Sequence, residues 1–292
     1  MARFGRVLTA MITPFTPEGA LDRAGAAELA KWLIAQGNDG LVVAGTTGES
    51  PTLSTSEHLD LIQIVREAVP EAVVVAGVGS NDTNYVTTMI KDVNDMGVDG
   101  YLTVTPYYNR PSQAGIAAHF AAQAEATDLP LMLYDIPVRS GRKIDTATIL
   151  SLASQHPNIV ALKDAAGAPG ATAHLLSEAP DGFEVYSGDD SLTLPLLAVG
   201  ATGVVGVATH WLASTMREMI EAFLGGNVKL ARQLNAAMIP SFNFEASELA
   251  PNPVPTKAVL RALGQPSGFC RLPMGPEPDG LASQAQALLA SL

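Results

Sequence analysis

The chain has 292 residues, of which 47% are apolar and 16% are charged. This composition allows a large buried core and excludes an intrinsically disordered chain. Its 29 acidic residues outnumber its 17 basic ones, and the net charge of −12 argues against nucleic acid or anionic membranes as partners. The single cysteine, Cys270, excludes an intrachain disulfide and a cysteine-based metal cluster.

The N-terminal segment predicts a first strand and no targeting peptide, because its apolar run is short and stops at Thr13 and Pro14. Nowhere does the sequence contain the roughly 18 consecutive apolar residues that suggest a membrane-spanning helix. We therefore expect a cytoplasmic protein, long enough for one large domain and a small appendage.

Short apolar runs recur along the chain, each followed by a polar loop and an amphipathic helix. The runs cover residues 7–12, 40–45, 72–79, 100–105, 129–136, 159–164, 183–188 and 203–208. Most are continuously apolar, which is typical of parallel strands covered on both faces. Eight such strands predict an α/β fold, a closed (β/α)8 TIM barrel. A doubly wound sheet is the alternative, but no complete G-x-G-x-x-G motif follows the first run.

The helices between the runs begin and end at recognisable residues. Asp22 precedes an apolar-periodic stretch that stops at Gly37, a start and stop with suitable chemistry. Ser54 and Glu57 have the spacing of a capping box. Asp145 opens a further helix before the sixth run.

The pattern changes after the eighth run, where residues 209–292 contain helical periodicities and no convincing strand. The first of these helices would complete the barrel, and the rest would form a helical extension. We therefore predict a catalytic barrel over residues 1–224 and a C-terminal helical region over residues 225–292, with proline-rich stretches at 251–255 and 273–278.

Lys163 is the sharpest candidate for chemistry. The active site of a barrel lies where the strands end, and of the six lysines only Lys163 directly follows the apolar residues of one of these runs. There the ammonium group would lose part of its hydration, which lowers its pKa and frees the amine as a nucleophile. The alternative is a strand-end lysine that pairs with Asp164 or another carboxylate.

The loop after the second run, GTTGES at 45–50, is a second candidate. Its small residues let backbone amides approach a ligand, and the hydroxyls of Thr46 and Thr47 add donors, so the loop predicts a carboxylate cradle. The alternative is a tight turn in which one of these threonines caps the next helix.

Two further loops carry polar aromatic or charged side chains. After the fifth run, Tyr134 offers a phenol for proton transfer and Arg139 a fork for a second carboxylate, although packing and solvation are the ordinary roles of such residues. After the fourth run, the adjacent Tyr107 and Tyr108 cannot both face one core, so one of them reaches elsewhere.

The sequence predicts no metal site. The two aspartates of SGDD, at 187–190, lack a His or further carboxylate at a suitable spacing. The five histidines form no metal-binding motif, and neither a nucleophile elbow nor a complete P-loop is present.

Together these motifs resemble the dihydrodipicolinate synthase family, part of the N-acetylneuraminate lyase group of class I aldolases. The resemblance covers nearly the whole chain, with the motifs in the family's order and spacing. They are GTTGES (45–50), TPYYNRPSQ (105–113), YDIPVRSG (134–141), IVALKDAAG (159–167), SGDD (187–190) and PNPVPTK (251–257). The resemblance implies a lyase, 4-hydroxy-tetrahydrodipicolinate synthase, that condenses pyruvate with L-aspartate 4-semialdehyde in the diaminopimelate route to lysine. No cofactor is implied beyond the covalent imine with pyruvate.

The resemblance also implies roles in catalysis. Lys163 resembles the lysine that forms a Schiff base with pyruvate, and Tyr134 the general acid and base that shuttles protons. Thr46 and Tyr108 resemble the rest of a hydroxyl relay, in which the tyrosine reaches in from a neighbouring subunit. A homotetramer, built as a dimer of dimers, is implied in the same way.

Further positions resemble those that bind the substrates. Thr47, with the Thr46 amide, resembles the site of the pyruvate carboxylate, and Arg139 the residue that grips the carboxylate of the semialdehyde. Gly188 and Val205 match positions that offer backbone carbonyls near the site.

The family's lysine feedback site is matched less well. Ser50, His58, Asn81 and Tyr107 fall at positions resembling this interfacial allosteric site. However, Thr55 and Tyr85 stand where lysine-sensitive bacterial members usually carry a His and a Glu. The missing carboxylate would pair with the effector's ammonium group, so we predict weak or absent inhibition by L-lysine.

Two other functions compete with the synthase. A related class I aldolase or dehydratase could act on another keto acid, although sialic acid and sugar-acid aldolases generally differ at the position of Arg139. A non-catalytic barrel is the other, since a fold does not by itself determine a function; the joint retention of lysine, tyrosine, threonines and arginine argues against it.

Overall fold

The computed structural model describes residues 2–292. All of the predicted strands form, and they pair in chain order into a closed eight-stranded parallel barrel, because β8 pairs back with β1. The strands are β1 (Val7–Ala10), β2 (Gly40–Val43), β3 (Val73–Gly77), β4 (Gly100–Val104), β5 (Leu131–Asp135), β6 (Ile159–Asp164), β7 (Glu184–Ser187) and β8 (Gly203–Gly206). The predicted TIM-barrel fold is therefore confirmed.

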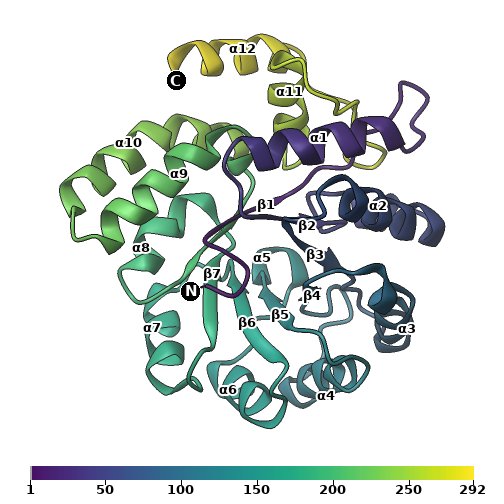
Figure 1. The fold of residues 1–292 in the computed structure, drawn as a ribbon, viewed down its shortest axis with the longest axis vertical. Coiled ribbons are helices and arrows are strands. Elements are labelled where there is room, and N and C mark those ends of the chain that lie inside the picture. The colour runs from purple at the N-terminus through teal and green to yellow at the C-terminus, as the bar shows by residue number, and fades with distance from the viewer. Residues whose placement is uncertain (1) are drawn as a thin grey trace.

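Helices surround the barrel on its outside, as Figure 1 shows along the barrel axis. The α-helices are α1 (Arg23–Ala35), α2 (Thr55–Ala68), α3 (Thr83–Val93), α4 (Gln113–Ala124), α5 (Pro137–Ser140), α6 (Thr146–Gln155), α7 (Pro169–Glu178), α8 (Thr193–Leu197), α9 (Thr209–Leu224), α10 (Val228–Glu245), α11 (Val254–Ala262) and α12 (Leu281–Ser291). Short 3-10 helices lie at η1 (Ser50–Thr52), η2 (Asn94–Met96) and η3 (Asp190–Leu192).

The strands are apolar throughout because both of their faces are covered. One cluster of buried side chains, including Leu8, Val42 and Leu102, fills the inside of the barrel. A second, larger cluster packs the outer faces of the strands against the helices and includes Leu41 and Leu133. Neighbouring residues of a strand thus enter different cores, which is the alternation that a barrel requires.

The predicted helix starts agree with the structure. The Asp22 side chain accepts a hydrogen bond from the backbone of Gly25, and Ser54 and Glu57 form the reciprocal bonds of a capping box. Helix α6 begins directly after Asp145 as expected, but the Asp145 side chain makes no capping bond.

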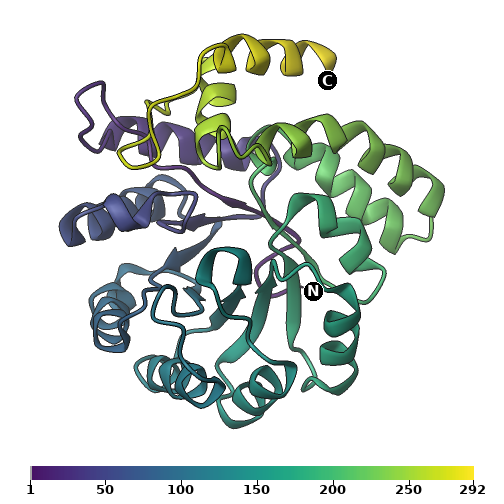
Figure 2. The same cartoon turned by 180° about the vertical axis from the view of Figure 1, so that it is seen from behind.

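The C-terminal helices are built onto the barrel. Helix α10 continues past Pro240 to Glu245 and shares with α9 a buried cluster that also contains Val7 and Val204 from the first and last strands. Helices α11 and α12 lie beside α1, in Figure 1 and in the reverse view of Figure 2. A domain boundary at residue 224 stays a prediction. Within the described residues, no helix is long and apolar enough to cross a membrane.

Candidate active site

Lys163 lies inside the barrel, on strand β6, where its side chain is only 4% exposed. The next residue, Asp164, points to the opposite face of the strand, where it accepts hydrogen bonds from Thr172 and the backbone of Ala166. Within residues 2–292, no carboxylate oxygen lies within 4.0 Å of the Lys163 Nζ. The alternative interpretation, a strand-end lysine neutralised by Asp164, is therefore wrong.

The position of Lys163 favours its uncharged amine. The pKa of Lys163 is lowered to about 8, mainly by burial; the negative charge of Asp190 opposes this shift, and the positive charge of Arg139 adds to it. An ammonium group loses hydration when it is buried, so the neutral form gains relative stability. Far more of the amine is therefore free to act as a nucleophile near neutral pH than in an ordinary lysine.

Gly188 follows β7 beside the lysine, and its backbone N–H donates to the Asp164 carbonyl at 2.7 Å. A β-carbon on this glycine would lie 2.9 Å from Cγ and 3.0 Å from Cε of Lys163. Any larger residue would therefore displace the lysine side chain. The glycine is needed for space, in addition to the backbone carbonyl predicted from the sequence.

Tyr134 is the neighbour of Lys163 across the β5–β6 pair. The Lys163 Nζ lies 4.4 Å from the centre of the Tyr134 ring, and the tyrosine is 6% exposed. Burial raises the pKa of Tyr134 well above its usual value, despite the opposing charge of Arg139. The phenol is therefore protonated at neutral pH and can donate its proton to a reacting group in the cavity.

The GTTGES loop closes another side of the same cavity. Thr47 is 4% exposed, and its Oγ1 accepts a hydrogen bond of 3.0 Å from the side-chain amide of Asn252. Thr46 lines the cavity that contains Lys163 and also an adjoining one. These cavities, of about 280 and 290 Å³, lie at the lower end of the range for ligand pockets and suit small molecules.

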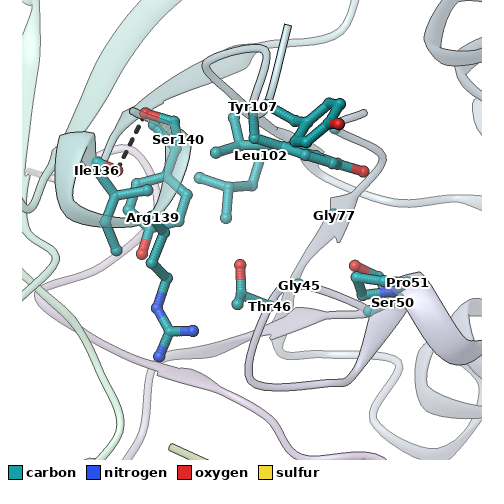
Figure 3. A pocket seen from close by; sticks show the side chains of 15 residues that line it. Gly45, Thr46, Ser50, Pro51, Gly77, Leu102, Tyr107, Ile136, Arg139 and Ser140 are labelled. Carbon is teal, nitrogen blue, oxygen red and sulfur yellow. Dashed lines mark hydrogen bonds between the residues drawn. The ribbon is translucent and has the colours of Figure 1, made fainter. Parts of the chain in front are cut away.

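Arg139 lies on the short helix α5 at the mouth of the site, and its side chain is exposed. Its guanidinium Nη2 lies 3.5 Å from the backbone oxygen of Asn252. Ser140, one residue on, donates to the Ile136 carbonyl at 3.1 Å and ties the short helix to the end of β5 (Figure 3). Arg139 is thus placed to meet an anion that enters from solvent.

The adjoining cavity contains only part of the predicted lysine site. Figure 3 shows Ser50 and Tyr107 on one side of it and Arg139 on the other, with Thr46 between them. Asn81 supports this wall by donating to the Tyr107 carbonyl at 3.1 Å. His58 is not among the lining residues, because it is 4% exposed and its Nε2 lies 2.7 Å from the Gly77 carbonyl.

Tyr108 and Val205 have opposite surroundings, because Tyr108 is exposed to solvent and Val205 is buried. Tyr108 is 91% exposed and has a positive φ of 70°; it lines the adjoining cavity but is not among the residues that line the cavity of Lys163. Val205, on β8, is buried in the cluster inside the barrel, together with Tyr134. Of the predicted catalytic residues, one chain therefore brings together Lys163, Tyr134 and Thr46.

Several residues of the cavity were not predicted as site residues. Asp189, Asp190 and Glu245 line it, and Asn252 contacts Thr47. Burial raises the pKa of Asp190 to about 6, although the backbone N–H of Val207 donates to it at 2.8 Å. Burial and the nearby aspartates also raise the pKa of Glu245. The SGDD and PNPVPTK motifs contained three of these residues, but nothing in the sequence indicated Glu245.

No group of three or more His, Cys, Asp or Glu side chains that could hold a metal ion occurs among the described residues. The carboxylates of Asp189 and Asp190 instead accept hydrogen bonds from neighbouring protein groups. Asp189 accepts from the Ser191 backbone and hydroxyl, and Asp190 accepts from the backbone after β8.

The sequence is similar to those of a known protein family and of curated enzymes. Residues 3–291 match the model of the Dihydrodipicolinate synthetase family. A 4-hydroxy-tetrahydrodipicolinate synthase from Moorella thermoacetica is 49% identical, and the match covers 93% of this chain and 92% of the relative. One from Thermosynechococcus vestitus is 47% identical, with 100% and 98% covered.

Solved structures of dihydrodipicolinate synthases are also similar to this chain. A DHDPS from Cyanidioschyzon merolae, solved with lysine bound, superposes with a TM-score of 0.97 at 42% identity, over 100% of this chain and 99% of that one. A dihydrodipicolinate synthase from Bacillus anthracis gives a TM-score of 0.96, also at 42% identity, with 100% and 99% covered.

Proposed function

The chain belongs to the dihydrodipicolinate synthetase family, and we propose from its site that Lys163 is the residue that forms the imine with pyruvate. Its reaction is that of a 4-hydroxy-tetrahydrodipicolinate synthase, a class I aldolase-type lyase. The enzyme condenses pyruvate with L-aspartate 4-semialdehyde in the diaminopimelate pathway to lysine. The observation that carries the proposal is a buried lysine amine that has no carboxylate partner among residues 2–292 and lies beside a protonated phenol.

The chemistry begins at the Lys163 amine, which attacks the keto carbon of pyruvate. Loss of water gives an imine, and the imine draws electrons from the methyl carbon so that a proton leaves it. The resulting enamine carbon attacks the aldehyde carbon of the semialdehyde. The amino group of that second substrate then displaces Lys163 from the imine carbon, which closes the ring and frees the enzyme.

Each proton transfer in these reaction steps needs a group that donates or accepts the proton. Tyr134 is 4.4 Å from the lysine amine by its ring centre and acts as the general acid and base. Thr46 relays protons from the cavity wall. Tyr108 completes the relay from a neighbouring subunit, which its 91% exposure supports.

The two carboxylate substrates are bound by local positive and hydrogen-bonding groups, although the protein as a whole is acidic. Thr47 and the Thr46 amide bind the carboxylate of pyruvate, and Arg139 binds that of the semialdehyde at the mouth. Gly188 and Val205 offer backbone carbonyls next to the imine. Preorganised donors of this kind act strongly in a site from which water is excluded.

The proposed enzyme is an assembly of identical subunits that acts without a cofactor. We propose a cytoplasmic homotetramer, a dimer of dimers, in which the exposed Tyr108 of one subunit reaches the site of its neighbour. It needs no cofactor, since the imine itself is the electron sink. The barrel over residues 1–224 carries the chemistry, and residues 225–292 support it.

An activity assay tests the proposal. The purified protein should form product from pyruvate and L-aspartate 4-semialdehyde and should not cleave sialic or sugar acids. Lys163→Arg should lower kcat by roughly 10³-fold or more, because the nucleophile is lost. The matched control Lys229→Arg, on an exposed part of α10, should leave kcat unchanged. Activity retained in Lys163→Arg would refute the proposal.

A further inference from the structure

Thr47 and Asn252 join the GTTGES loop to the C-terminal region. The Asn252 Nδ2 donates to the Thr47 Oγ1 at 3.0 Å, between residues 205 positions apart in the chain. A threonine hydroxyl has one proton to donate and two lone pairs to accept with. Because the amide already occupies one lone pair of Thr47, the hydroxyl proton is directed away from Asn252 and remains available for a ligand in the cavity.

A second hydrogen bond, from Thr256, fixes the orientation of the Asn252 side-chain amide. The Thr256 hydroxyl, at the first turn of α11, donates to the Asn252 Oδ1 at 3.3 Å, and Thr256 is 0% exposed. Since the oxygen of the amide faces Thr256, its nitrogen faces Thr47. The three side chains therefore form a directed chain of donors from Thr256 through Asn252 to Thr47.

A buried ion pair links the two backbone segments that carry Thr256 and Thr47, the ends of this series of hydrogen bonds. Lys257 follows Thr256, and its Nζ lies 2.6 Å from the Glu49 Oε1; both side chains are 1% exposed. The other oxygen of Glu49 accepts from the Arg271 backbone at 2.8 Å. Glu49 stands two residues after Thr47, so this pair holds helix α11 against the loop that carries the threonine.

We propose that Asn252 is a positioning residue for pyruvate, acting through Thr47. The amide holds the Thr47 hydroxyl so that it donates to the pyruvate carboxylate, an anion for which such a hydrogen bond is stronger than between neutral groups. The proposal rests on the function proposed above, because it requires pyruvate to bind beside Lys163. It assigns to the C-terminal region a part, exerted through Thr47, in binding the first substrate.

Asn252→Asp tests the proposal with little change in shape. The new carboxylate would take the Thr47 proton for itself and repel the pyruvate carboxylate. The readout is the pyruvate concentration that gives half-maximal trapping of the Lys163 imine by borohydride, which needs no second substrate. We expect this concentration to rise about tenfold or more, with kcat at saturating pyruvate within about twofold. A tenfold change corresponds to ~1.4 kcal/mol.

Matched variants separate positioning from folding. Asn227→Asp adds the same charge to the same region at an exposed helix N-cap, where Asp serves as well as Asn, and should leave trapping unchanged. Thr256→Val keeps Asn252 but frees its amide to rotate, so the half-saturating concentration should rise about threefold. An unfolding midpoint for each variant verifies that it is folded.

A double-mutant cycle with Thr47→Val gives the decisive result. If Asn252 acts through Thr47, Asn252→Ala should raise the half-saturating concentration in the wild-type background and have no effect in the Thr47→Val background. Equal effects in both backgrounds, or unchanged trapping in Asn252→Asp, would overturn the inference. A wild-type enzyme that forms no adduct at Lys163 would instead refute the proposed function, so the two failures are distinguishable.

Discussion

The absence of a side chain at Gly188 leaves the space that the Lys163 side chain occupies. The lysine side chain passes so close to the glycine that a β-carbon would lie 2.9 Å from its Cγ and 3.0 Å from its Cε. Lysine Cγ and Cε belong to the stem that aims the amine at the cavity. The glycine after β7 therefore decides where the nucleophile on β6 can point.

Gly188→Ala should consequently lower kcat about 10- to 100-fold, because a displacement of a reacting group by about 1 Å can have an effect of that size. Steady-state kinetics measure it, and Gly170→Ala is the control, since nothing lies within 4 Å of a β-carbon there. A Gly188→Ala enzyme with wild-type kcat would show that the lysine stem has room to move.

The pH dependence of imine formation should reflect the lowered pKa of Lys163. With a pKa of about 8, only about a tenth of the amine is free at pH 7 and about half at pH 8. The rate of imine formation with pyruvate should rise with pH and level off above about pH 9. Stopped-flow measurements over pH 6–10 check it, and an inflection near the ordinary lysine value of 10.5 would contradict the account.

Two charge-removing variants should move that inflection in opposite directions. The Arg139 charge lowers the pKa of Lys163 and the Asp190 charge raises it. Arg139→Gln should therefore shift the inflection to higher pH, and Asp190→Asn should shift it to lower pH. Shifts in the same direction would mean that altered burial, and not charge, governs the lysine.

The Lys257–Glu49 pair should matter for stability because both side chains are 1% exposed. Lys257→Met should lower the free energy of unfolding by roughly 3–5 kcal/mol, because it leaves a buried carboxylate without its partner. Removing both charges should have a smaller effect than the sum of the single changes. Arg23→Met breaks a pair whose arginine is 60% exposed and should change the free energy by less than about 1 kcal/mol. Urea unfolding measures all three, and equal losses for Lys257→Met and Arg23→Met would be inconsistent with the buried pair.

Inhibition by L-lysine should be weak or absent. Thr55 begins α2 and Tyr85 lies on α3, and neither provides a carboxylate for the effector's ammonium group. The Nε2 of the buried His58 donates to the Gly77 carbonyl, so this side chain is not free to replace the missing carboxylate. Activity measured against increasing L-lysine checks the prediction, and half-inhibition at submillimolar concentration would disprove it.

Much of the fold could be predicted because its signals are local. The continuous apolar runs are a direct consequence of burial on both strand faces, so each run contained the strand that formed. Ser54 with Glu57, and Asp22, satisfy backbone groups a few residues away, which makes helix starts visible in the sequence. Lys163 stood out for the same reason, as the one lysine directly after the apolar residues of a run.

The parts that escaped prediction depend on contacts between distant segments. Asn252 and Thr47 are 205 positions apart, and no local pattern states that α11 packs against the GTTGES loop. Glu245 reaches the cavity because α10 continues through Pro240, a residue that ordinarily ends a helix. Tyr108 is 91% exposed and lines only the adjoining cavity, so its proposed role in the relay of a neighbouring subunit stays a prediction.

The central claim is that Lys163 forms the imine with pyruvate, and trapping the imine tests it most directly. The protein is incubated with pyruvate, reduced with borohydride, digested and mapped by mass spectrometry, with Lys163→Arg treated in parallel. The account predicts a pyruvate-derived adduct on Lys163 and none in the variant. An unmodified Lys163, or an adduct on another lysine alone, would contradict it.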